Sequence, residues 1–257
     1  MNTVISLLLM YMFNSVHRDT SYWIAKGLLD HIDELSHLSV NDFASLMGTS
    51  TATLNRFCKE IGFQNFRELK AGLEGTRDGR LWQIKTRMDN TSTDRLLDTV
   101  EFLLNQKVDR DLYLERSKEI ARKLHDSREA YITGAVYPLA LSLDFVEDLF
   151  LFGCKVRILH STTGAINEKI QSDDFCLILT NTGRFLTLNK PHFLSLYTRQ
   201  WDMAILTAND QFSRYDKIST QLILPAHPEN FLDNQVFITL LQLIEYQFYQ
   251  EYVGSSQ

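Results

Sequence analysis

One short segment of the chain carries polar and cationic side chains at the spacing of a helix face. Hydroxyl and amide groups can donate hydrogen bonds to phosphates and base edges, and an arginine can pair with guanine through two bonds. The residues with this chemistry are Ser50, Thr51, Thr53, Asn55, Arg56 and Lys59, with Lys70 a few turns later. The pattern indicates a surface that binds double-stranded DNA, although a solvated helix of an all-helical bundle would show a similar face.

Two short helices joined by a tight turn would position this surface. The first begins after Ser39, which can act as N-cap, and ends at Gly48. Its apolar stripe is predicted to consist of Phe43, Leu46 and Met47. The second begins at Ser50 or Thr51 and closes at Gly62. Its inner side is predicted to consist of Leu54, Phe57, Cys58 and Ile61. This arrangement is a helix-turn-helix.

The same segment resembles the N-terminal domain of the RpiR family of bacterial transcription regulators. In that family the second helix carries a Ser-x-x-Thr-x-x-Arg-Phe-Cys run, followed by a Leu/Ile-Gly-Phe turn and a Phe-x-x-Leu-Lys ending. The matching residues are Ser50, Thr53, Arg56, Phe57, Cys58, Ile61, Gly62, Phe63, Phe66, Leu69 and Lys70. The resemblance implies a regulator of carbohydrate metabolism that places residues 50–61 in the major groove of an operator.

The charge of the chain is unevenly distributed. The net charge is −6 over 257 residues, yet residues 49–87 hold eight Lys and Arg against four Asp and Glu. A basic patch on an acidic molecule suits a protein that must leave DNA readily. The three cysteines, Cys58, Cys154 and Cys176, show no paired spacing. They are typical of reduced thiols in a cytoplasmic protein, so no disulfide, metal or cofactor is expected.

The first residues are strongly apolar. From Val4 to Phe13 only Ser6 is polar, but a bilayer span needs about 20 apolar residues, and the basic start of a signal peptide is absent. A helix buried against the DNA-binding domain or a partner subunit is predicted, with no membrane partner. Weak membrane association is the alternative.

Residues 20–35 are predicted to form a scaffold helix, and another helix begins at Phe66. The glycines Gly72, Gly75 and Gly79 then indicate a flexible exit from the domain. Four cations there serve either solubility or phosphate contact: Arg77, Arg80, Lys85 and Arg87. The predicted organisation is a DNA-binding domain at 1–76, a linker with a connecting helix at 77–107, and a second domain at 108–257.

The second domain alternates short apolar runs with helical patterns. Helices are predicted at residues 93–104, 112–125, 138–152, 185–197 and 231–249. Strands are predicted at residues 130–133, 155–159, 175–179, 203–206 and 221–224. Strands and helices in alternation favour a three-layer α/β domain with a parallel sheet of about five strands.

Two loops lie where such a sheet binds ligands, at the carboxyl ends of its strands. Their candidate effector-binding residues are Gly134, Tyr137, Thr180, Thr182, Gly183 and Arg184. Hydroxyls, a glycine that exposes backbone N–H groups and an arginine can hold a phosphate dianion. Ordinary turns would have the same composition.

The order of parts also resembles a sugar isomerase (SIS) domain, which follows the DNA-binding domain in RpiR regulators. Asp144-Phe145, Gly153-Cys154-Lys155-Val156 and residues 174–184 carry this resemblance, the last with a Ser-x-Ser-Gly-Arg-like loop. It implies a phosphosugar effector. Val136 and Pro138 replace a glycine and a serine of the family's first loop, and Phe185 replaces a threonine, so a domain that only dimerises is the alternative.

A phosphosugar isomerase is the less favoured reading, because it would need a placed acid or base. The candidates are Glu147, Glu168, His192, His227 and Glu229, none of them in a motif. No catalytic residue is assigned, and the protein is expected not to be an enzyme. A homodimer or homotetramer is expected from a C-terminal apolar stripe formed by Phe237, Leu240, Leu241, Ile244 and Phe248.

Overall fold

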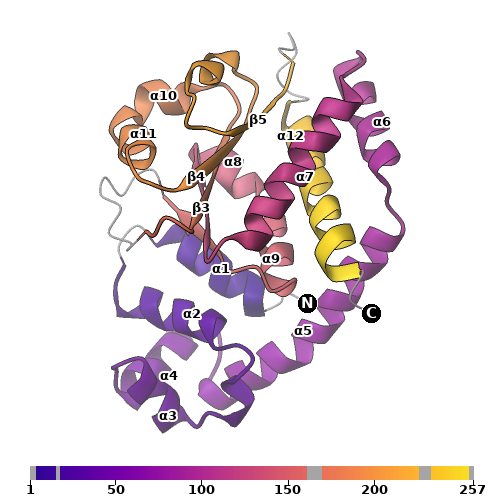
Figure 1. Ribbon diagram of the computed structural model, residues 1–257. Coiled ribbons are helices and arrows are strands. Elements are labelled where there is room, and N and C mark those ends of the chain that lie inside the picture. The colour runs from indigo at the N-terminus through magenta and orange to yellow at the C-terminus, as the bar shows by residue number, and fades with distance from the viewer. Residues whose placement is uncertain (1–3, 16–17, 161–169, 226–232, 255–257) are drawn as a thin grey trace. The chain divides into compact units, whose positions relative to one another are not determined.

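The computed structural model describes residues 4–15, 18–160, 170–225 and 233–254 (Figure 1). The chain divides into two compact units, Met1–Lys85 and Thr86–Gln257. This division falls inside the segment 77–107 that the sequence assigned to a linker. Residues 86–107 therefore belong to the second unit.

The first unit is entirely helical in its described residues. Its helices are α1 (Val4–Asn14), α2 (Thr20–Asp30), the 3-10 turn η1 (Leu35–His37), α3 (Val40–Leu46), α4 (Thr51–Glu60) and α5 (Phe66–Asp89), which continues into the second unit. The ring of Phe43 stacks on Phe66 at 5.2 Å, and Tyr11 of α1 meets Phe57 edge-on at 5.4 Å. The aromatic contacts thus join α3 to α5 and α1 to α4.

The predicted helix-turn-helix is present as α3 and α4. Ser39 caps α3 and forms a capping box with Asp42, and Ser50 caps α4 by accepting from Thr53 N–H. Gly48 adopts φ +60°, the left-handed conformation that the turn requires. The expectation for Leu46 was wrong, because its side chain is 51% exposed. The short α3 buries the consecutive Phe43 and Ala44, so Leu46 lies on its outer side.

The flexible exit predicted from three glycines was also wrong, since α5 is one continuous helix of 24 residues. A helical glycine costs about 1 kcal/mol relative to alanine, which a long helix can absorb. A Cβ on Gly72 would lie 2.9 Å from Val4 Cγ2, so this glycine allows α1 to approach closely. The predicted helix at 20–35 is shorter in the structure, because α2 ends at Asp30.

The second unit is built on a sheet whose five strands are all parallel, in the order β2-β1-β3-β4-β5. The strands are β1 (Ala130–Gly134), β2 (Val156–Leu159), β3 (Phe175–Thr180), β4 (Asp202–Thr207) and β5 (Thr220–Ile223). Each begins and ends close to its predicted bounds. Nearly continuous apolar runs such as Phe-Cys-Leu-Ile-Leu suit strands that are covered on both faces.

Helices cover both faces of this sheet (Figure 1). One face carries α10 (Arg184–Leu188), α11 (Lys190–Tyr197) and the 3-10 turn η2 (Asp210–Arg214). The other face carries α7 (Arg110–Asp126), α8 (Val136–Leu141), α9 (Leu143–Leu151) and α12 (Asp233–Phe248). Helix α6 (Thr93–Leu104) packs on α12, and a π-helical turn η3 (Tyr249–Val253) ends the described chain. The predicted three-layer architecture is confirmed.

The apolar stripe of α12 is buried within the chain. Its five side chains are at most 2% exposed, and α12 packs against α6, α7 and α9. The stripe therefore cannot serve as a partner surface. Among the described residues, none of the helices is both long and apolar enough to cross a membrane.

Candidate DNA-binding surface and effector site

Helix α4 has one buried and one polar side. Leu54, Phe57 and Cys58 are at most 1% exposed, whereas Arg56 and Lys59 point to solvent. At the N-terminus of α4 the hydroxyls of Ser50 and Thr53 lie 2.9 Å apart. Thr51 is half-buried beside them. The helix therefore presents two cations and a hydroxyl cluster on one accessible side.

Among the seven predicted DNA-binding residues, Asn55 and Lys70 form hydrogen bonds with other segments of the unit. The side-chain oxygen of Asn55 accepts from the N–H of Phe66 at 3.2 Å. The ammonium of Lys70 donates to the carbonyl of Leu38 at 2.8 Å, and lies 3.4 Å from that of Ser36. These contacts hold α5 against α4 and against the segment before α3. Contact of either residue with DNA stays a prediction.

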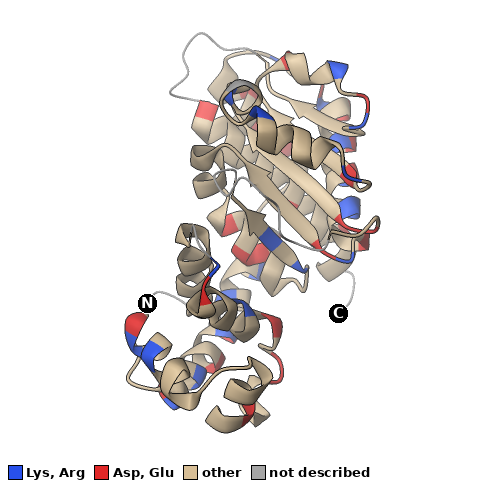
Figure 2. Cartoon of the chain, turned by 90° about the vertical axis from the view of Figure 1, so that its left-hand side faces the viewer, with Lys and Arg blue, Asp and Glu red and all other residues tan. Residues whose placement is uncertain are grey.

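Two further cations of α5 also have internal partners. Arg77 pairs with Asp33 at 2.5 Å. Arg87 contacts the carboxylates of Asp144, Asp148 and Glu245 in the second unit. In the view of Figure 2 both signs of charge are interspersed along the helices of the second unit.

The two predicted effector loops meet at one point of the sheet. Strands β1 and β3 are neighbours, with Gly134 in register with Leu179. Ala135 N–H donates to Leu179 O at 3.0 Å, which joins the start of the first loop to β3. In the order 2-1-3-4-5, chain direction across the sheet reverses between β1 and β3, and ligands of such sheets bind outside the strand ends at this place.

The glycines of these two loops have positive φ angles and lie close to neighbouring atoms. Gly134 has φ +141°, and a Cβ there would lie 1.9 Å from Leu179 O. Gly183 has φ +74°, and a Cβ there would lie 2.1 Å from the Asn209 amide nitrogen. That amide donates to Thr182 O at 3.1 Å, so the second loop is tied to the segment after β4.

The predicted effector side chains differ in exposure. Tyr137, Thr182 and Arg184 are exposed, whereas Thr180 is fully buried. Within the described part of the chain, the Thr180 hydroxyl has no hydrogen-bond partner. The first loop is less polar than the second, because Val136 is exposed and apolar and α8 begins without a side-chain cap.

A buried histidine lies beneath these loops. His192 of α11 is 3% exposed, and its Nε2 lies 3.2 Å from the hydroxyl of Thr133 in β1. Burial lowers the pKa of His192 to about 4, so the ring is neutral at pH 7. Its ring meets that of Phe185 edge-on at 5.9 Å. Sequence reasoning named His192 only as a possible acid or base, and no motif marks its contact with Thr133.

Of the other four acid–base candidates, the structure describes Glu147. Glu147 is 6% exposed on α9. Glu168, His227 and Glu229 lie outside the described residues.

The cysteines are free and buried. Burial raises the pKa of Cys58 to about 11 and that of Cys154 to about 12, and it also raises the pKa of Cys176. These thiols are therefore protonated at neutral pH and poorly reactive. The described residues contain no group of three His, Cys, Asp or Glu side chains that could hold a metal ion.

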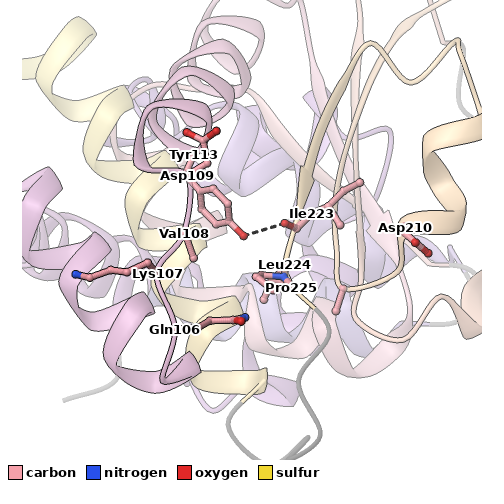
Figure 3. Close-up of a pocket in the computed structure, with 10 residues that line it drawn as sticks. Gln106, Lys107, Val108, Asp109, Tyr113, Asp210, Ile223, Leu224 and Pro225 are labelled. Atoms are coloured by element: carbon pink, nitrogen blue, oxygen red, sulfur yellow. Dashed lines mark hydrogen bonds between the residues drawn. The ribbon is translucent and has the colours of Figure 1, made fainter.

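A cavity of about 460 Å³ opens at the ends of β4 and β5, a place that sequence reasoning did not single out (Figure 3). Several of its polar groups have structural partners. Tyr113 donates to Ile223 O at 2.9 Å, and the Asp109 carboxylate caps α7 by accepting from Leu112 N–H at 3.0 Å. Lys107 points away from the cavity, and its ammonium pairs with Glu101 at 2.6 Å.

These features define a protein that joins a helix-turn-helix unit to a three-layer parallel α/β unit. Residues 18–78 match the family model of the helix-turn-helix domain, rpiR family. The N-terminal unit of this chain therefore belongs to the rpiR family of helix-turn-helix domains, as its sequence resemblance predicted.

Comparison with curated proteins gives a short match. The chain is 45% identical over 47 residues to an uncharacterised HTH-type transcriptional regulator of Caldanaerobacter subterraneus subsp. tengcongensis. The match covers 18% of this chain and spans only 17% of the length of that relative. The match therefore concerns less than a fifth of either chain.

Three solved structures resemble the chain remotely. The Vibrio vulnificus NanR protein complexed with ManNAc-6P is 14% identical, covers 95% of this chain and 92% of its own, and has a TM-score of 0.47. A putative phosphosugar isomerase from Bacteroides fragilis is 14% identical over 64% of this chain and 95% of its own, with a TM-score of 0.47. The sugar isomerase domain of an RpiR transcription factor from Sphaerobacter thermophilus is 12% identical over 62% and 88%, with a TM-score of 0.46.

Proposed function

We propose that the protein is a transcription regulator that binds DNA through α4 and senses a phosphosugar-like effector at the carboxyl edge of its sheet. The observation that carries the first part is the exposed side of α4, which presents Arg56, Lys59 and the hydroxyls of Ser50 and Thr53. A short helix of this kind fits the major groove, where cations and hydroxyls meet phosphates and base edges.

The regulator is proposed to act as a homodimer or homotetramer. One short recognition helix reads only a few base pairs, so useful specificity requires two half-sites on one face of the duplex. The operator is therefore expected to be an inverted repeat.

Selection of tight-binding duplexes from a random pool with the full chain tests this function. Enrichment of one inverted repeat, together with a dimer or larger species in sedimentation, is the expected result. A monomer at micromolar concentration that binds DNA with full affinity would contradict the paired arrangement. A pool without enrichment would contradict sequence-specific binding.

The effector is proposed to be an anionic, phosphorylated, sugar-like molecule held more by the second loop than by the first. Thr182, Gly183 and Arg184 supply a hydroxyl, a backbone position and a cation at the point where β1 and β3 diverge. Pro138 of the first loop has no N–H to donate to a phosphate.

Calorimetry with hexose 6-phosphates and amino-sugar 6-phosphates tests the effector site. The double variant Thr182→Val, Arg184→Ala is expected to lose binding. Binding that survives both changes would place the site elsewhere.

The second candidate for the α/β unit is a scaffold without a ligand. The apolar first loop favours it, since Val136 is exposed where a hydroxyl would help to hold a phosphate. Absence of binding to every sugar phosphate of the panel would support this candidate. The isomerase alternative is disfavoured, because Glu147 and His192, its two described acid–base candidates, stand in no motif that fixes a catalytic role. A helix-turn-helix unit would also be unexplained in an isomerase.

A further inference from the structure

Beneath the two effector loops, threonines occupy the carboxyl ends of three adjacent strands. Thr133 of β1, Thr180 of β3 and Thr207 of β4 are all fully buried. Strand side chains alternate between faces. These threonines therefore share the face that carries Tyr131, Ile178 and Ile205, which is the face covered by α10 and α11.

The hydrogen bonds of Thr133 define the tautomer of His192. The Thr133 hydroxyl lies 2.8 Å from Leu159 O, and because a carbonyl cannot donate, the single hydroxyl proton points there. Thr133 must then accept from His192, whose Nε2 is 3.2 Å away. A neutral imidazole carries one proton, so Nδ1 of His192 is a bare acceptor.

This acceptor is buried and unmatched. Nδ1 of His192 has no hydrogen-bond partner among the described residues, although the side chain is 97% buried. The low pKa caused by burial keeps the ring neutral, so Nδ1 stays free to accept. An unpaired buried polar group destabilises a fold, so it requires an explanation.

An unmatched donor lies on the same face. The hydroxyl of Thr180 is also without a partner in the described part of the chain. Thr133 is in register with Ile178, and Thr180 is the next residue of β3 on that face, so the two threonines are diagonal neighbours. A free donor and a free acceptor thus lie under the two loops proposed to bind the effector.

We propose that His192 contacts the effector. One hydroxyl of a sugar-like ligand accepts from Thr180 and donates to Nδ1 of His192. The inference rests on the proposed effector site and adds the group that selects the ligand. A hydroxyl can accept and donate at once, whereas an ether or carbonyl oxygen cannot donate. The site would therefore prefer a ligand with a hydroxyl here over its deoxy analogue.

Calorimetry of the full chain with the same panel of hexose and amino-sugar 6-phosphates tests this contact. His192→Phe keeps an aromatic ring beside Phe185 and removes both nitrogens, and Thr180→Val keeps the volume and removes the hydroxyl. Each change is expected to weaken binding of the tightest panel member about 10- to 100-fold.

Thr220→Val is the matched control. Thr220 at the start of β5 is also fully buried with an unpartnered hydroxyl, but it lies at the opposite end of the strands from the loops. Its replacement is expected to leave binding unchanged.

Nitrogen-15 NMR of the His192 ring provides a test without substitution. The proton is expected on Nε2, and the Nδ1 resonance is expected to move when the tightest panel member is added. A proton on Nδ1 in the free protein would overturn the inference. Equal affinity of the wild type, His192→Phe and Thr180→Val for the ligand would overturn this contact but not the proposed effector site. Absence of binding to every member of the panel would overturn both.

Discussion

The side-chain oxygen of Asn55 in α4 accepts a hydrogen bond from the backbone N–H of Phe66, the first residue of α5, at 3.2 Å. A residue of the proposed recognition helix thereby caps the next helix, because the first N–H groups of a helix have no partner within it. Phe66 also stacks on Phe43 of α3. The start of α5 is thus held by both helices of the motif.

Asn55→Ala is expected to destabilise the N-terminal unit by about 1 kcal/mol, because the N–H of Phe66 loses its acceptor. Asn55→Asp keeps the acceptor and is expected to retain most of the stability. Urea unfolding of the full chain, followed by circular dichroism, measures both. The exposed neighbour Arg56→Ala is the control and should stay within about 0.5 kcal/mol of the wild type. An Asn55→Ala variant as stable as this control would show that the bond contributes nothing.

Arg56→Ala is expected to weaken operator binding by about 1–3 kcal/mol and to relax base preference at one position, if Arg56 reads a base. If Arg56 contacts only phosphate, the loss should be similar on all sequences, and the salt slope should fall by about one unit. Fluorescence anisotropy at several salt concentrations separates the two results. Arg214→Ala, which removes an exposed arginine from η2 of the other unit, is the control. Unchanged affinity of Arg56→Ala for every duplex would exclude this side of α4 as the reading face.

Local signals in the sequence predicted most of the architecture. Caps at Ser39 and Ser50 and the glycine turn at Gly48 are contacts between near neighbours, so the helix-turn-helix could be read directly. The positions of the strands could also be predicted, because short apolar runs between helical patterns are typical of buried strands. The continuity of α5 could not be read, since Gly72 owes its place to Val4, which is distant in the sequence.

For the candidate effector site, the sequence predicted the positions of the loops but not the contacts of their side chains. The loops after β1 and β3 were expected at the sheet edge, and Gly134 is in register with Leu179 there. The partners of individual side chains were not readable. Lys70 bonds to a carbonyl 32 residues earlier, and His192 contacts a threonine 59 residues earlier. Spacing along a chain carries no information about such pairs until the fold brings them together.

Gly134→Ala is expected to destabilise the second unit strongly. Its φ of +141° is unfavourable for a side chain, and the new Cβ would lie 1.9 Å from Leu179 O, a backbone atom that cannot move without breaking the β1–β3 pairing. A loss of about 4 kcal/mol or more, or failure to fold, is expected. Gly75→Ala is the matched control, because nothing lies within 4 Å of its Cβ position in α5. That change should stabilise the helix by up to about 1 kcal/mol. Thermal unfolding of both variants decides the matter.

Glu101 is expected to make stability depend on acidity below pH 5. Hydrogen bonds from Arg110 and Lys107 lower the pKa of its carboxyl to about 2. Because the pKa in the folded protein lies below the unfolded value of about 4.3, the contribution is complete above that value and is lost as the pH falls toward 2. Glu101→Gln removes the charge. The difference in melting temperature between wild type and variant should be largest near neutral pH and shrink as the pH falls from 5 to 2. A difference that is constant over this range would contradict the ion pairing.

Arg87→Met is expected to cost about 3 kcal/mol of unfolding free energy, because it removes a cation that contacts two buried carboxylates. The guanidinium of Arg87 contacts Asp148 and lies 3.0 Å from Glu245, and these side chains are 0% and 1% exposed. Its own exposure of 34% places the cost at the lower end of the range for buried pairs. The double variant Arg87→Met, Asp148→Asn removes one of these charges without changing the shape, and it should recover part of the loss in urea unfolding. If Arg87→Met alone unfolds like the wild type, the cation contributes through solubility or phosphate contact, as its sequence context also allowed.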